Sequence, residues 1–161
     1  MLFILKNNRD KVQKDHTFLG NRKIFYNSHS VESWQGYAFE LICLIHIAQI
    51  RKCLGIAGIS TSASSWRYLP NKSENDKKAQ IDLVIERGDR NINLCEMKFC
   101  VGPFTIKNSY AEDVRRRIQL FKEKEKTTYG LISTFVTTFG VADGIHKDVA
   151  EAEVTAEDLF G

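Results

Sequence analysis

The sequence predicts an α/β fold in which a mixed β-sheet is flanked by helices. Three observations predict it: a long apolar helix comes first, an apolar hairpin follows, and an amphipathic helix then leads into a continuous apolar strand. A hairpin pairs its strands antiparallel, whereas a strand reached through a helix can join the sheet in parallel. The 161 residues fit one compact domain, and an apolar share of 43% is enough to build its core.

The first element is a helix predicted over residues 31–54. Ser30 or Ser33 can cap its start, and Gly55 stands just past its end. Apolar residues occupy most of its circumference, so we expect it to be largely buried. Glu40 is a lone acid in this helix, and it either reaches solvent at an edge or points to a metal or another polar site.

A strand is predicted within residues 58–69, and a charged loop follows over 71–78. The hairpin comes next, with strands at 80–86 and 92–100 and a turn centred on Asp89. Gly, Asp and Asn in this turn are the residues that tight turns favour.

The hairpin carries three charges where a buried hairpin favours apolar residues. With the turn at Asp89, Asp82 lies opposite Glu96, and strand alternation then places Asp82, Glu96 and Lys98 on one face. The other face receives the apolar positions Ile81, Leu83, Ile85, Cys95, Met97 and Phe99. Two facing carboxylates repel one another, so Lys98 or a divalent cation such as Mg²⁺ is needed to offset them. The alternative is a solvated hairpin end with an incidental ionic cluster, and a register slip of one residue would separate Asp82 from the other two charges.

The second half begins with a helix over 109–126, where Ser109 and Glu112 have the spacing of a capping box. An apolar stripe along this helix predicts the side that packs on the sheet: Tyr110, Val114, Ile118 and Phe121. The apolar run 128–140 is typical of a central strand covered on both faces. A last strand or short helix follows, and two of its residues can cap a final turn: Thr155 and Asp158.

Charge and cysteine usage limit the classes of function. Residues 1–30 hold six Lys or Arg and two Asp, a local charge of +4 within a total of +3. This basic segment either meets nucleic-acid phosphates or is a solvated tail. The four cysteines form no C-x-x-C pair and are expected to be reduced core residues. Without a signal peptide or a membrane-length apolar run, a cytoplasmic protein with no membrane partner is expected.

Glu40 on the first helix, Asp82 on one strand and Glu96-x-Lys98 on the next strand resemble the pattern of the PD-(D/E)XK nuclease superfamily. The proline that usually precedes the Asp is replaced by Ile81. The resemblance implies a restriction-endonuclease-like fold, a mixed sheet flanked by helices, over residues 31–161.

The chain also resembles the C-terminal domain of a family of prokaryotic ATPases, in which this domain follows an AAA+-type ATPase domain. The segments that carry this resemblance are SWQGYAFE (33–40), SSWRY (64–68), QIDLVIER (80–87), NLCEMKF (93–99), TFVTTFG (134–140) and EVTAEDLF (153–160). The chain has no G-x-x-x-x-G-K-[ST] motif. We therefore interpret it as a detached C-terminal portion, with residues 1–30 as a remnant of a preceding domain and the ATPase domain as a partner.

The resemblance implies a role for each residue of the pattern. Asp82 and Glu96 would bind Mg²⁺ or Mn²⁺ together with the Met97 carbonyl, and Glu40 would hold the metal or its water. Lys98 would position the attacking water and stabilise charge on the phosphorane. Substrate contacts are expected from three further residues: Gln80, Arg115 and Arg116. The arginines either line a DNA cleft or form an ordinary solvated face.

These expectations lead to two hypotheses of different class. The first is a metal-dependent phosphodiesterase that acts on DNA. The alternative is a non-catalytic module that binds DNA or a partner protein, is driven by its ATPase and keeps a vestigial nuclease fold.

Overall fold

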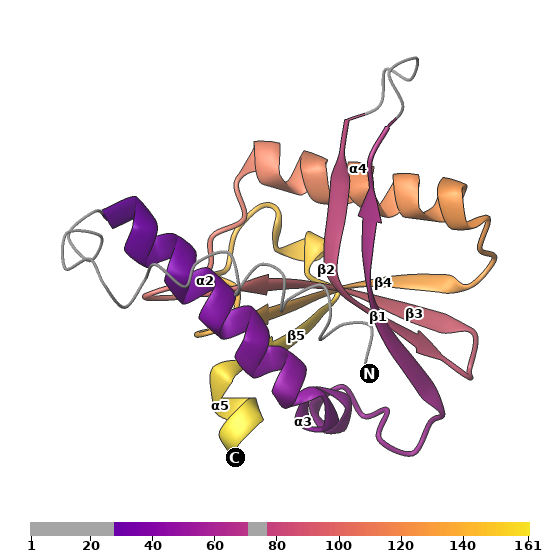
Figure 1. The fold of residues 1–161 in the computed structure, drawn as a ribbon, viewed down its shortest axis with the longest axis horizontal. Coiled ribbons are helices and arrows are strands. Elements are labelled where there is room, and N and C mark those ends of the chain that lie inside the picture. The colour runs from indigo at the N-terminus through magenta and orange to yellow at the C-terminus, as the bar shows by residue number, and fades with distance from the viewer. Residues whose placement is uncertain (1–27, 71–76) are drawn as a thin grey trace, which may run out of the picture.

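The computed structural model describes residues 28–70 and 77–161. Residues 1–27 of the predicted basic segment 1–30 and most of the predicted charged loop therefore lie outside the described residues. The described chain folds into one five-stranded mixed sheet flanked by helices, which confirms the predicted α/β class (Figure 1). The strands are β1 (Thr61–Tyr68), β2 (Ala79–Arg87), β3 (Asn91–Lys98), β4 (Gly130–Thr137) and β5 (Ala152–Thr155). The helices are α2 (Ser28–Ile45), α3 (Ile47–Cys53), α4 (Asn108–Glu125), the 3-10 helix η3 (Lys147–Val149) and α5 (Ala156–Phe160).

The strands lie in the order in which they occur in the chain. β1, β2 and β3 form an antiparallel meander, β4 is parallel to β3, and β5 is parallel to β4. The connection from β3 to β4 contains α4, as parallel pairing requires a crossover. β4 is therefore an inner strand, and its last five residues are buried, as the apolar run 128–140 predicts.

Helices cover both faces of the sheet, with α4 on one face and α2, α3 and α5 on the other (Figure 1). Side chains that alternate along β2 and β3 supply both cores. The core beside α2 and α5 includes Phe39, Cys43, Leu83, Ile85, Cys95, Met97, Val136 and Leu159. The core beside α4 includes Ile81, Val84, Ile92, Leu94, Val114, Phe121 and Phe135. This double cover buries the middle of the hairpin on both of its faces.

The predicted helix over 31–54 is two helices, because the helix is interrupted at His46 between α2 and α3. Gly55 ends the second one with a φ of +69°, a left-handed conformation that glycine adopts without steric cost. The prediction that this helix is largely buried is wrong. Only one side of α2 packs against the sheet. Phe39 and Cys43 lie on that side and are buried, whereas Ile45 is 67% exposed.

The hairpin register is the predicted one. Leu83 pairs with Cys95 and Val84 with Leu94, which corresponds to a turn centred on Asp89. The prediction for Ile81 is wrong, because its side chain packs with Val84 in the α4-side core. The pairing of β1 with β2 explains this, since the register shifts between Ser64 and Trp66.

This shift is a β-bulge at Asp82. Ser64 pairs with Val84 and Trp66 pairs with Ile81, so two residues of β2 lie opposite a single residue of β1. The extra residue reverses the alternation of side chains at this point. The bulge therefore sends Ile81 to the α4 side and Leu83 to the α2 side, with Asp82 between them.

Capping of the last two helices differs from the prediction in one case. The predicted capping box at Ser109 and Glu112 is wrong: α4 starts at Asn108 with Lys107 as its N-cap, and no side chain caps it. The pair at the start of α5 is confirmed, because the Thr155 hydroxyl accepts from the Asp158 N–H and the Asp158 carboxylate accepts from the Thr155 N–H. No helix within residues 28–70 and 77–161 is long and apolar enough to cross a membrane.

The capping box predicts the cost of removing its hydroxyl. Thr155→Ala should lower the free energy of unfolding by about 1 kcal/mol, because one N–H at the start of α5 loses its acceptor. Thr155→Ser keeps the hydroxyl and should lie within about 0.5 kcal/mol of the wild type. Urea denaturation followed by circular dichroism measures both variants, and equal losses for Ala and Ser would contradict the capping role.

Candidate functional site

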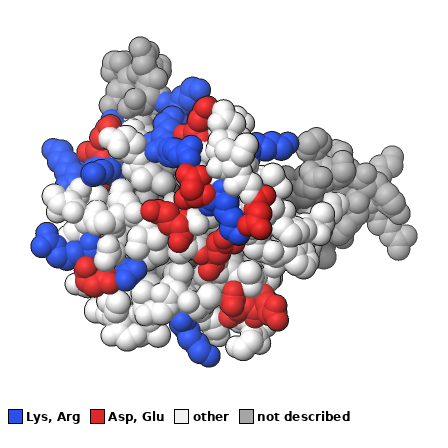
Figure 2. All heavy atoms as spheres, turned by 180° about the vertical axis from the view of Figure 1, so that it is seen from behind, with Lys and Arg blue, Asp and Glu red and all other residues white. Residues whose placement is uncertain are grey.

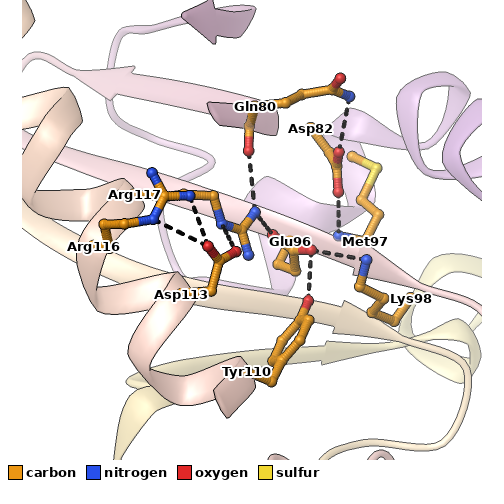
Figure 3. A network of polar contacts seen from close by, with 9 residues as sticks. All are labelled: Gln80, Asp82, Glu96, Met97, Lys98, Tyr110, Asp113, Arg116 and Arg117. Atoms are coloured by element: carbon orange, nitrogen blue, oxygen red, sulfur yellow. Dashed lines mark hydrogen bonds and ion pairs between the residues drawn. The ribbon is translucent and has the colours of Figure 1, made fainter. Parts of the chain in front are cut away.

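Glu96 is the centre of a network of charged and polar groups between β3 and α4 (Figure 3). Its side chain points to the α4 side of the sheet, and the residue is only 8% exposed. Oε1 accepts from the Tyr110 hydroxyl at 2.6 Å and lies 2.8 Å from Lys98 Nζ, while Oε2 accepts from Arg117 Nη1 at 2.5 Å. A buried carboxylate needs such partners, because a buried unpaired charge costs several kcal/mol, of order.

Arg117 joins three elements through one guanidinium group. Nη1 donates to Glu96 on β3 and also to the Gln80 backbone carbonyl on β2 at 3.0 Å. Nε lies 3.1 Å from Oδ2 of Asp113, one turn earlier on α4. The Arg117 side chain is only 12% exposed, so this arginine belongs to the buried network and not to the solvated surface of α4.

Asp82 lies in the β2 bulge beside this network. Its Oδ2 accepts from the Met97 backbone N–H at 3.0 Å, and its Oδ1 accepts from Gln80 Nε2 at 3.3 Å. Burial and the nearby Glu96 carboxylate both raise the pKa of Asp82, and the hydrogen bond from Met97 and the charge of Lys98 only partly offset them. The carboxylate of Asp82 is therefore less stabilised than the carboxylate of Glu96.

Glu96 behaves in the opposite way, although it is also buried. Burial opposes its ionisation, but the cations of Lys98 and Arg117 outweigh burial and lower the pKa of Glu96. Burial likewise disfavours the charged form of Lys98, and Glu96 outweighs it and raises the pKa of the ammonium group. Lys98 is therefore a persistent cation, which suits it to electrostatic stabilisation and not to proton abstraction.

Glu40 lies on the other side of the sheet from α4, on α2. Burial raises the pKa of the Cys43 thiol to about 12, and the charges of Glu40 and Asp82 add to this effect. The two carboxylates thus act on the same thiol from α2 and from β2. Glu96 makes its direct contacts with Lys98 and with α4, and the meeting of Glu40 with Asp82 in one site stays a prediction.

The network as it stands does not fit a divalent cation. Carboxylate oxygens are the right ligands for Mg²⁺, but both oxygens of Glu96 already bind cations and both oxygens of Asp82 accept N–H groups. The Met97 group that faces Asp82 is the N–H, not the predicted carbonyl ligand. Across residues 28–70 and 77–161, no three His, Cys, Asp or Glu side chains are grouped closely enough to hold one ion. The Mg²⁺ or Mn²⁺ site stays a prediction.

The three predicted substrate residues lie in different surroundings. Gln80 contacts Asp82 and accepts from Arg67 at 2.9 Å. Arg115 pairs with Asp148 of η3 at 3.0 Å, and Arg116 pairs with Asp113 at 2.6 Å. On the face in Figure 2, the described basic side chains alternate with acidic ones and form no broad basic area. Arg115 and Arg116 are thus ion-paired with neighbouring acids, and their contact with a substrate stays a prediction.

Sequence reasoning missed Tyr110 and Arg117 as members of the site. Tyr110 was assigned to the apolar stripe of α4, and its ring does pack against Phe104 and Phe135 while its hydroxyl reaches Glu96. Arg117 is one of three consecutive arginines, and the run itself does not show which of them faces the sheet. A usable signal existed, because position 117 follows Tyr110 by seven residues, which is two helical turns on the same face.

Comparisons with known proteins add little to this geometry. No family model matches the chain, and no curated protein matches it. The chain is similar to a crystal structure of a protein of unknown function, AF1548, with a TM-score of 0.45 and 19% identity. That match covers 74% of this chain and 64% of the other, so this chain spans less than two thirds of the length of that protein.

The hydrogen bond from Tyr110 predicts a stability change. Tyr110→Phe should lower the free energy of unfolding by about 2 kcal/mol, because Glu96 loses a buried donor at 2.6 Å. Tyr129→Phe is the matched control: Tyr129 is 39% exposed, and the change should cost less than about 0.5 kcal/mol. Chemical denaturation of both variants measures this, and equal effects would contradict a special role for the Tyr110 hydroxyl.

The raised pKa of Asp82 predicts that Asp82→Asn gains stability and that this gain depends on pH. Asp82 binds its proton more tightly in the folded state than in the unfolded state. Protonation of Asp82 therefore stabilises the fold at low pH, and this stabilisation is lost as pH rises above 3.8 and through the raised pKa. Asp82→Asn removes the charge and keeps an oxygen for the Met97 N–H. The variant should be more stable than wild type at pH 7, by about 1 kcal/mol, the usual size of a point-mutation effect.

Thermal melts between pH 4 and pH 8 test this gain. The difference between Asp82→Asn and wild type should shrink as pH falls. Asp89→Asn is the control, because Asp89 lies at the exposed hairpin turn with its pKa lowered by the hydrogen bond from Arg87. A loss of stability in Asp82→Asn at neutral pH would show that the carboxylate is not the destabilised group.

Proposed function

We propose that the domain is a nuclease-like module of the PD-(D/E)XK type, a phosphodiesterase that acts on DNA with a divalent cation. The single observation that supports this most is the meeting of Asp82 with Glu96 and Lys98 at one end of the β2–β3 hairpin, with mutual effects on their pKa values. The order of elements is consistent with it: a helix, a three-stranded meander, a helix and a parallel strand.

The chemistry of this cluster also favours function over stability. A buried carboxylate beside a partly buried one is costly, and a fold with no use for them would be better served by apolar residues at these positions. Proteins tolerate such local conflicts mainly at functional sites. Lys98 is 35% exposed in its side chain while it pairs with the buried Glu96, so its positive charge is accessible to an anionic substrate such as a phosphodiester.

The second candidate function is a DNA- or partner-binding module without catalysis, linked to an ATPase domain. One observation favours it: Glu96 is saturated by Lys98, Tyr110 and Arg117, and no oxygen remains for a metal in this arrangement. Such saturation is what a vestigial site would also look like. The two functions therefore differ in whether Glu96 can release its present partners and bind a metal.

Cleavage assays separate these two functions. Labelled single-stranded and double-stranded DNA are incubated with the purified chain and with Mg²⁺ or Mn²⁺, and products are followed on a gel. Asp82→Ala and Lys98→Ala should each reduce cleavage by at least about 100-fold, the usual cost of removing an electrostatic group from an active site. Asp89→Asn is the control, because it changes a carboxyl group to an amide in the same hairpin but outside the network. This variant should cleave DNA like the wild type.

Binding measurements complete the test. Calorimetry with Mn²⁺ should show a site in the wild type that Asp82→Ala removes. DNA that binds with a salt-dependent affinity but is never cut, with or without metal, would overturn the phosphodiesterase and favour the binding module.

A further inference from the structure

The outer side of α2 carries a stripe of exposed apolar side chains. Ile45 is 67% exposed, and Leu41 and Ile42 are exposed as well, although the same helix buries Phe39 and Cys43 on its inner side. Spacings of four and three residues place Leu41 and Ile42 beside Ile45 on one side of the helix. α2 is therefore apolar on two sides, and the sheet covers only one of them (Figure 1).

Neighbouring side chains extend this apolar surface beyond both ends of the stripe. Phe160 of α5 is 69% exposed, and its ring centre lies 4.8 Å from that of His46, the residue directly after Ile45. Trp34 and Tyr37 continue the exposed stripe towards the start of α2. A contiguous exposed apolar surface marks a contact with another segment or with another protein. We call the part at the C-terminal end of α2 the outer patch: Leu41, Ile42, Ile45 and Phe160.

The part of the chain that precedes α2 contains an apolar run that can reach the outer patch. Residues 1–5, MLFIL, are all apolar, and residues 6–27 join them to Ser28 at the start of α2. α2 has 18 residues and is therefore about 27 Å long. A flexible chain as long as residues 6–27 has a root-mean-square span of about 26 Å. The run at residues 1–5 can thus lie over the C-terminal end of α2.

The charges of the joining residues favour the same contact. Residues 6–27 hold six Lys or Arg and two Asp, a net charge of +4, whereas the two charged residues of α2 are both acids, Glu32 and Glu40. Opposite charges on the helix and on the joining residues attract each other at short range. The outer patch itself contains no charged residue, so residues 1–5 meet no charge that would have to be desolvated.

A second copy of the chain is the other occupant that an apolar patch of this kind could accept. A tether whose span matches the distance between two sites gives an effective concentration on the order of 1 mM. A separate copy binds only at its free concentration, and it also gives up translational and rotational freedom. The tethered segment is therefore favoured over a second copy.

We propose that residues 1–5 bind the outer patch within the same chain and cover the exposed side of α2. The contact gives this helix an apolar neighbour on its outer side, as the sheet does on its inner side. The inference is independent of the proposed nuclease function, because the outer patch and residues 1–5 lie outside the network around Glu96.

Photo-cross-linking on the full chain tests this contact. The photoreactive amino acid p-benzoylphenylalanine in place of Phe3 keeps an aromatic ring and reacts with C–H groups that it touches. We expect cross-links within one chain to the peptides that contain Leu41–Ile45 or Phe160, identified by mass spectrometry. Ile45→Glu should reduce their yield at least about tenfold, because the contact would then bury a charge. Ile145→Glu is the matched control: Ile145 is 93% exposed and lies outside the outer patch, so the yield should not change.

An NMR measurement leaves the outer patch itself unchanged. Phe3→Leu keeps an apolar side chain but removes the aromatic ring, whose ring current shifts the signals of nearby methyl groups. In spectra of isoleucine-labelled protein, the δ1 methyl signal of Ile45 should therefore move, and that of Ile145 should stay in place. Circular dichroism melts show which variants fold, and the NMR result holds even if Ile45→Glu does not fold.

Three outcomes would overturn the proposal. Cross-links found only in products of dimeric mass would assign the outer patch to a second copy. Cross-links only to other parts of the chain, or an Ile45 methyl signal that Phe3→Leu does not move, would show that residues 1–5 lie elsewhere. A cross-link yield that Ile45→Glu leaves unchanged would show that the apolar patch does not hold the segment. None of these measurements uses metal or DNA, so their result is separate from that of the cleavage assays.

Discussion

The ion pair between Glu96 and Arg117 is the interaction on which the rest of the site depends. Glu96 is buried at the end of β3, and Arg117 reaches it from α4 while also holding the Gln80 carbonyl of β2. One guanidinium thus ties two strands and the crossover helix together. Loss of Arg117 leaves the buried Glu96 with Lys98 as its remaining cation, and loss of Glu96 leaves Arg117 with Asp113. Either loss costs more than the net contribution of the intact pair, because a buried charge then has fewer partners.

The bulge in β2 gives this ion pair a second carboxylate as a neighbour. Without the extra residue, Ile81 would share the face of Leu83, and the alternation of β2 would be regular. With it, Asp82 lies between two apolar residues that face opposite cores, and its carboxylate bonds to the Met97 N–H. Bulges of this kind are frequent beside active sites, where they redirect a side chain. The cost is an acid whose pKa is raised by burial and by Glu96.

Much of the fold could be predicted from periodicity and turn chemistry, and some details could not. The hairpin register followed from a turn centred on Asp89, because a two-residue period leaves few registers that bury one apolar face. The buried strand β4 and the cap at Thr155 also followed from local patterns. The break at His46 and the exposed side of α2 did not, because they depend on how far the sheet extends beneath the helix. The bulge at Asp82 did not either, since the sequence between β1 and β2 carries no signal for how the two strands pair.

The sequence by itself determined three of the charges that the site contains and the spacing that brings them near each other. Asp82, Glu96 and Lys98 come from neighbouring strands, and their meeting follows from strand geometry and one turn. Only the tertiary structure decided how those charges are satisfied. Three consecutive arginines are equivalent in the sequence, but the packing of α4 on the sheet rotates Arg117 inward and leaves Arg115 and Arg116 outside. Which cation neutralises Glu96 depends on that rotation, because the Coulomb energy of a buried pair is set by contact distance and desolvation, which local sequence does not encode.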